Sequence, residues 1–211
     1  MRAYMKSEMP YRGVMAGPLR RITREIFAGH PLEGFAEWRT VVLDLWRNAR
    51  FREERYAAIG LVSYKDYEEF RTLKALPMLE EMITTGAWWD YVDGIASSLL
   101  GGLLRRHPAE MKRRMLVWAR SRDLWKRRSA ILCQLGFKEE TDLDLLYACI
   151  ASTIDEREIF IRKAIGWALR QYAWTDPAEV VRFVESQGDR LSPLSRREAL
   201  KNTGRGARRR S

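Results

Sequence analysis

The sequence has few of the residues that build metal centres and disulfide frameworks, with two cysteines and two histidines among 211 residues. Cys133 and Cys149 are too few for either kind of site, and we expect both thiols to be buried in a reducing compartment. His30 and His107 each adjoin a proline, without the carboxylate–histidine spacing of a metal site. The sequence therefore predicts no bound metal and no cofactor.

Long apolar runs and strand patterns are also missing. No run of 18 apolar residues occurs, so we expect no segment to cross a membrane, and the first residues lack the apolar stretch of a secretory signal. Alternating β-branched runs and Asn-Gly or Asp-Gly turns are absent. The glycine-rich phosphate loop and the Gly-x-Ser-x-Gly elbow are absent as well, which argues against the enzyme classes that use them.

Helical periodicity is what the sequence does contain. Phe35, Trp38, Val42, Leu45 and Trp46 share one helix face, and 46% of the residues are hydrophobic, enough for a sizeable core. Turn-forming residues separate helical segments of about 10 to 18 residues. These breaks fall at residues 29–31, 63–65, 84–86, 101–102, 107–108, 121–123, 136, 175–177 and 186–189. The chain is predicted to be all-α.

Basic residues outnumber acidic ones by 38 to 28, and 30 of the 38 are arginine. The arginine fork fits phosphate, although a GC-rich genome produces the same bias without a function. The order of the charges is more informative, because residues 105–128 hold ten cations and two acids and residues 139–158 are acidic. A segregated basic surface attracts polyanions. Residues 204–211 add four arginines and are expected to form a disordered basic tail.

A weak internal repeat indicates how the helices are arranged. Residues 55–59, 128–132 and 162–166 share Arg-x-Ala followed by small or apolar residues, at separations of 73 and 34. Such spacings suggest an α-solenoid of stacked helix pairs, curved and with a concave face. We expect one domain over residues 1–203, whose basic concave face holds a rod such as duplex DNA.

Four residues form a candidate site on that face: Trp89, Asp93, Arg128 and Trp167. Trp89 and Asp93 are four apart and share one helix face. The gaps from Asp93 to Arg128 and on to Trp167, 35 and 39 residues, each span about one helix pair. Each residue also has an ordinary interpretation, since tryptophans usually lie in the core, an early aspartate usually caps a helix, and an arginine in a basic run is usually solvated.

The chain resembles a known family in several ordered segments. They are similar to conserved blocks of the AlkD-type DNA alkylation-repair proteins, including the Trp-Trp-Asp-x-Val-Asp signature, and cover essentially the whole chain except the tail. The segments are residues 13–20, 83–93, 124–132, 160–170 and 191–201. The family's extra helix before a Tyr-Met-Lys segment has no counterpart before Tyr4, so either that helix is missing or the start of the sequence is misplaced. The resemblance therefore leaves DNA contacts at that end open.

This resemblance implies HEAT-like helical repeats and a DNA glycosylase that removes cationic alkylated purines, typically 3-methyladenine and 7-methylguanine. It assigns the active site to Trp89, Asp93, Arg128 and Trp167, all of which are present; some relatives lack part of this set and bind DNA structures without cleaving bases. In this mechanism Asp93 stabilises the oxocarbenium-like sugar and orients water. The tryptophans stabilise the cation, and Arg128 holds a phosphate and favours ionised Asp93.

Other expectations concern the partners. No deep base pocket or intercalating wedge is indicated, so we do not expect full base flipping. Two alternatives stay open, a non-catalytic binder of branched or damaged DNA and a protein-binding helical repeat. We expect a cytoplasmic monomer, associated with the nucleoid when bound to duplex DNA. Additional phosphate contacts are predicted at Arg20, Arg21, Arg127, Lys163 and Arg170.

Overall fold

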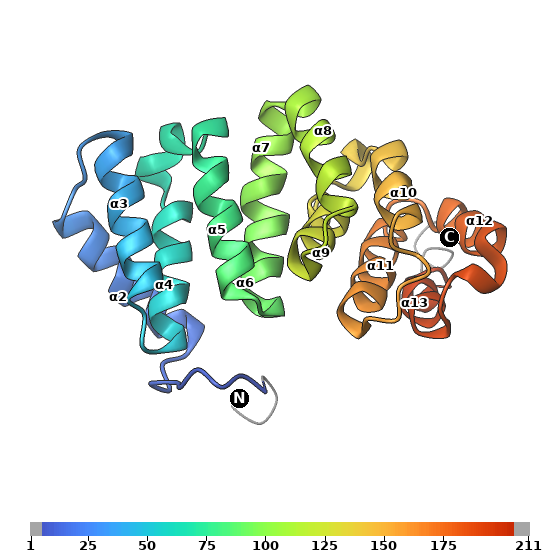
Figure 1. Ribbon diagram of the computed structural model, residues 1–211, viewed down its shortest axis with the longest axis horizontal. Coiled ribbons are helices and arrows are strands. Elements are labelled where there is room, and N and C mark those ends of the chain that lie inside the picture. Colours follow the sequence, from blue (N-terminus) through green and yellow to red (C-terminus); the bar gives the residue numbers. More distant parts are fainter. Residues whose placement is uncertain (1–5, 205–211) are drawn as a thin grey trace. The chain divides into compact units, whose positions relative to one another are not determined.

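The computed structural model describes residues 6–204 and groups them into two compact units, one ending at Tyr91 and the next beginning at Val92. Both units are helical, and no strand occurs in the described residues (Figure 1). The predicted fold class, all-α with helical repeats, is confirmed. The single domain, the curvature and the basic concave face stay predictions. Tyr4 and the basic tail beyond Gly204 lie outside the described residues.

The first unit consists of helices that pack in pairs, α2 against α4 and α3 against both α4 and α5 (Figure 1). Its elements are α2 (Ala16–Gly29), α3 (Gly34–Arg47), α4 (Arg52–Ser63), η1 (Lys65–Phe70), η2 (Leu73–Ala75) and α5 (Leu76–Gly86). Large apolar side chains fill the core, among them Trp38, Trp46, Met78 and Met82. Helix α6 (Trp89–Gly94) begins in this unit and ends in the second.

The second unit continues the helical pairs, with α9 packed against α8 and α11, and α11 packed against α13. Its elements are η3 (Ile95–Leu100), α7 (Gly101–Arg106), α8 (Pro108–Ala119), α9 (Leu124–Leu132), η4 (Lys138–Glu140), α10 (Leu143–Ala151), α11 (Ile159–Tyr172), α12 (Pro177–Gln187), η5 (Gly188–Arg190), α13 (Pro193–Ala199) and η6 (Leu200–Asn202). Cys133 and Cys149 are buried free thiols, as expected. Among residues 6–204, no helix has the length and apolarity needed to span a bilayer.

Short polar side chains start several helices where the sequence predicts them. Asp176 precedes Pro177, and its carboxylate accepts a hydrogen bond from the backbone amide of Glu179. Ser192 precedes Pro193, and its hydroxyl accepts a hydrogen bond from the backbone amide of Ser195. Such caps satisfy amides that have no partner inside the helix. These two helix starts are therefore fixed by local chemistry that the sequence reveals.

The break predicted at Gly101 and Gly102 is wrong, because the helix continues through both residues. η3 is a turn of π-helix in which the Gly101 amide donates to the carbonyl of Ala96, and it leads directly into α7. A Cβ at Gly101 would lie 2.7 Å from the carbonyl oxygen of Cys133. Glycine is needed here because it lets the end of α9 approach closely, not because it ends a helix.

Charges that are segregated in the sequence pair with one another in the second unit. Three ion pairs join the basic run to the acidic stretch that follows it: Arg105–Glu140, Lys112–Asp142 and Arg127–Glu156. Four other arginines of the run are exposed and form no ion pair with the described residues: Arg113, Arg114, Arg120 and Arg122. The basic surface is therefore smaller than the sequence count suggests.

Candidate active site

A buried arginine holds one aspartate of the candidate site by both carboxylate oxygens. Arg128 Nε donates to Asp93 Oδ1 and Nη2 donates to Oδ2, each at 2.7 Å. Two parallel bonds of this kind fix the plane of the carboxylate as well as its position. The charge of the guanidinium also favours the ionised carboxylate. Asp93 is thus a fixed anion in the last turn of α6.

The burial of Arg128 bears on its predicted phosphate contact, which stays a prediction. Its side chain is 1% exposed, whereas the Asp93 side chain is 18% exposed. The remaining terminal nitrogen, Nη1, donates to the carbonyl oxygen of Phe160. A guanidinium enclosed in this way presents little surface to a DNA phosphate, and its observed contacts hold Asp93 in place. The expectation that an arginine in a basic run is solvated fails here, because the carboxylate and the carbonyl replace water around the buried cation.

Trp167 joins this pair from α11. The Arg128 Cζ lies 5.4 Å and the Arg170 Cζ 5.9 Å from the centroid of its ring, both within cation–π range. The indole is half-buried, so part of it stays accessible beside Asp93 and Arg128. The second unit therefore brings together three of the four predicted site residues: an anion, its positioning cation and an indole.

Close packing of α11 against α13 sets the position of Trp167. A Cβ at Gly166 would lie 2.5 Å from the Cβ of Glu198, so only glycine allows this approach. The Ser195 hydroxyl, buried in α13, donates to the carbonyl oxygen of Arg162 at 2.9 Å. These contacts give a physical reason for the glycine that precedes Trp167 and for the serine in residues 191–201.

Trp89 belongs to the first unit, where it is the first residue of α6 and is half-buried. Four residues separate it from Asp93, which corresponds to about one turn of helix. That Trp89 acts together with Asp93 and Trp167 stays a prediction from the spacing.

Sequence reasoning missed a second buried arginine–aspartate pair, which lies in the first unit. The Arg52 side chain is 1% exposed and donates to both oxygens of Asp90, the residue after Trp89. The Tyr56 hydroxyl donates to the same carboxylate. Burial and this hydrogen bond raise the pKa of Tyr56. The network holds the start of α6 in place. In the sequence, only Asp90, the first aspartate of the Trp-Trp-Asp segment, indicated this pair.

Glu53 was also missed, and it anchors the segment before α2. Its buried carboxylate accepts the backbone amides of Arg12, Gly13 and Val14 at 3.0, 2.9 and 3.1 Å. Gly13 has φ +86°, a conformation that disfavours other residues. Burial acts to raise the pKa of Glu53, but the backbone donors outweigh it and the pKa is lowered.

Acidification is expected to remove this anchor. Folding lowers the pKa of this carboxyl below its ordinary value, 4.5 for glutamate, so the ionised group stabilises the folded protein at pH values above 4.5. That stabilisation is lost as the pH falls through the pKa of the folded state. Glu53→Gln should therefore lower the free energy of unfolding at neutral pH by about 1 to 3 kcal/mol. On acidification below pH 4.5, the unfolding free energy of this variant should fall less than that of the wild type. Urea unfolding across this range measures both. Glu25→Gln, on the exposed surface of α2, is the matched control; equal acid sensitivity of all three proteins would contradict the role of Glu53.

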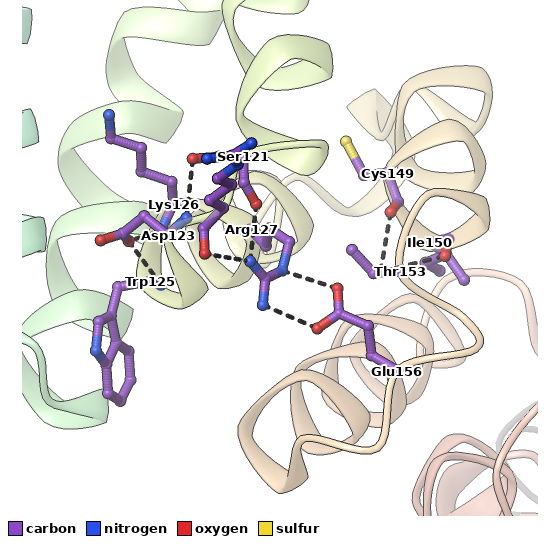
Figure 2. Close-up of polar contacts among 10 residues, drawn as sticks. Ser121, Asp123, Trp125, Lys126, Arg127, Cys149, Ile150, Thr153 and Glu156 are labelled. Atoms are coloured by element: carbon purple, nitrogen blue, oxygen red, sulfur yellow. Dashed lines mark hydrogen bonds and ion pairs between the residues drawn. The ribbon is translucent and has the colours of Figure 1, made fainter.

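Arg127 is largely engaged within the protein (Figure 2). Its Nη1 donates to the carbonyl oxygens of Ser121 and Arg122 at 2.7 and 2.9 Å, and its Nη2 donates to Glu156 at 2.9 Å. The Asp123 side chain in the same turn accepts the amides of Trp125 and Lys126, both at 2.9 Å, and so caps α9. Arg127 thus stabilises the turn before α9, the helix that contains Arg128.

The other predicted phosphate contacts differ in availability. Arg20, Arg21 and Lys163 are exposed. Arg170 is half-buried and pairs with Glu198 at 2.8 Å. Contact between DNA and these residues or Arg127 stays a prediction. The three exposed side chains are the most accessible to a DNA phosphate.

Comparison with known proteins gives a match to a family model and matches to solved structures. Residues 1–203 match the model of a family described as DNA alkylation repair enzymes. Among solved structures, a protein described as a predicted DNA alkylation repair enzyme from Enterococcus faecalis superposes with a TM-score of 0.82 and 30% sequence identity. The match covers 95% of this chain and 92% of that one. No curated protein matches the chain.

Proposed function

Since the chain belongs to the family of DNA alkylation repair enzymes, we propose that it is a DNA glycosylase. Its substrates in this proposal are cationic alkylated purines in duplex DNA, 3-methyladenine and 7-methylguanine, and it hydrolyses their N-glycosidic bond. The observation that carries the proposal is the Asp93 carboxylate, which is fixed by buried Arg128 yet partly accessible. Its partial exposure leaves the anion accessible to a substrate, which a fully buried carboxylate would not be.

The chemistry requires a fixed anion more than an acid. Alkylation at N3 or N7 makes the purine a cation and a good leaving group, so the base needs no proton. As the C1′–N bond breaks, its electron pair neutralises the purine and positive charge develops on the deoxyribose. Asp93 stabilises that charge and orients a water. The water oxygen bonds to C1′, and the proton it loses passes to solvent.

The two indoles supply a weaker form of the same stabilisation. An aromatic face near a developing cation contributes about 0.5 to 2 kcal/mol. Trp167 lies beside the Asp93–Arg128 pair because α11 packs against α13, and the spacing of Trp89 makes it the second indole. Arg128 is a positioning residue in this scheme, because its fork holds the carboxylate while its own surface stays enclosed.

Selectivity should follow the charge of the lesion. We expect release of 7-methylguanine from a duplex oligonucleotide and release of neutral 1,N6-ethenoadenine slower by on the order of 100-fold or more, which is about 2.7 kcal/mol in the barrier. Chromatography of freed bases measures both rates in single-turnover reactions. Equal rates would refute selection by lesion charge. Binding of both duplexes without release of either base would favour a non-catalytic binder of damaged DNA.

A further inference from the structure

A groove in the first unit, outside the residues assigned above to base release, has the composition of a phosphate-binding site. It lies between α2 and the end of α4, which pack against each other (Figure 1), and its volume is about 590 Å³. Its lining combines cations, hydroxyls and aromatic rings and contains no acidic residue. The lining residues are Arg20, Thr23, Arg24, Phe27, Ala28, Gly60, Ser63, Tyr64 and Lys65.

The cations of the groove are Arg20, Arg24 and Lys65. All three are exposed, and none forms an ion pair with another described residue. Arg20 and Arg24 are four apart on α2, a spacing at which like charges destabilise a helix. An anion in the groove relieves this repulsion, and the bound ligand then interacts with three cations and no opposing carboxylate.

The rest of the lining suits a nucleotide unit better than a free ion. Phe27 and Tyr64 meet edge to face, with ring centroids 5.6 Å apart, and both are half-buried. Ala28 and Gly60 add little side-chain volume, which keeps the groove open beside the rings. Aromatic surface next to a track of cations is the arrangement with which proteins hold a nucleic-acid strand, because sugars and bases pack on rings while phosphates meet the cations.

We propose that this groove binds the sugar–phosphate backbone of a DNA strand at a distinct contact from the residues that release the base. Arg24 and Lys65 provide phosphate contacts, together with Arg20, and Phe27 and Tyr64 form the apolar wall. The proposal rests on DNA being the substrate, and it does not depend on glycosylase activity. It therefore stands or fails on binding to undamaged DNA alone.

Salt dependence of binding tests the groove directly. The wild-type chain and Arg24→Ala/Lys65→Ala are compared by fluorescence anisotropy with an undamaged duplex and with a single strand, across a salt series. Loss of two phosphate contacts should reduce the slope of log K against log salt by about 1.8 for the duplex and about 1.4 for the single strand. Arg39→Ala/Arg50→Ala removes the same charge from exposed positions of the same unit and should leave the slope nearly unchanged.

Comparison of the groove variant with the control variant decides whether the groove binds DNA. A reduced slope with either DNA, seen only in the groove variant, supports the proposal and shows which form of DNA the groove prefers. Equal changes in the two double variants would show general electrostatics and overturn it. Groove-dependent binding of inorganic phosphate without any change with DNA would overturn it as well. Circular dichroism checks folding, and Lys65→Ala alone, at an exposed position beyond α4, serves if the double variant unfolds; its slope should fall by about half as much.

Discussion

Asp93→Asn is expected to reduce release of 7-methylguanine by about 10² to 10³-fold, the effect of removing one preorganised electrostatic group from a transition state. The amide is neutral, so it cannot stabilise the positive sugar or orient water as an anion does. DNA affinity should stay within about twofold, because the carboxylate attracts no phosphate. Single-turnover base release and anisotropy measure the two properties separately. An undiminished release rate would remove Asp93 from the mechanism.

The amide also perturbs the pair with Arg128, and this must be separated from the chemistry. Asn keeps one acceptor for the guanidinium but turns an NH₂ group toward the second N–H, which leaves a buried donor without its acceptor. A loss of about 1 to 3 kcal/mol in unfolding free energy follows. Assays well below the unfolding midpoint remove this contribution. Asp144→Asn, an exposed aspartate of α10, is the matched control and should keep the wild-type rate.

Arg128→Ala is expected to have the largest effect on stability. Removing one partner of a buried ion pair costs about 3 to 5 kcal/mol, because the remaining charge loses its compensation, and here the carbonyl of Phe160 loses its donor too. Base release should fall as well, since Asp93 is no longer held. Urea unfolding gives the free energy, and single-turnover release below the midpoint gives the rate.

DNA affinity distinguishes positioning from a phosphate contact. Because Arg128 is 1% exposed, its loss should leave the salt slope of DNA binding unchanged in protein that is still folded. Arg128→Lys keeps the charge but cannot donate in parallel to both oxygens, so it should recover part of the stability and less of the rate. A normal unfolding midpoint combined with a salt slope reduced by about 0.9 would instead identify a direct phosphate contact.

Features decided by neighbouring residues could be predicted from the sequence. The starts of α12 and α13 follow from Asp176 and Ser192, each placed before a proline, because a capping side chain reaches only the next few amides. The pairing of Asp93 with Arg128 and the approach of Trp167 also agree with their spacing of about one helix pair. Local chemistry and repeat length carry this information.

Features decided by distant residues could not be predicted. Arg128 looks like a member of a solvated basic run and Arg52 like an ordinary charged surface residue. Only their partners, 35 and 38 residues away, explain why they are buried. Gly101 looks like a helix breaker, whereas its real constraint is the carbonyl of Cys133. In each case tertiary packing overrides the local tendency of the residue, and a single sequence does not show the partner.

The π turn of η3 determines where the chain between Asp93 and Gly101 tolerates a change in length. A π turn accommodates one residue beyond ordinary α-helical winding. Deleting one residue from this turn would restore regular winding and leave the flanking turns in register. A residue added to or removed from the α-helical turns beside it would instead rotate everything on one side by about 100° relative to the other. The carboxylate would then point away from Arg128, or Gly101 away from Cys133. Loss of one codon within the π turn is therefore compatible with the site, whereas the same loss in the α-helical turns beside it dismantles the site.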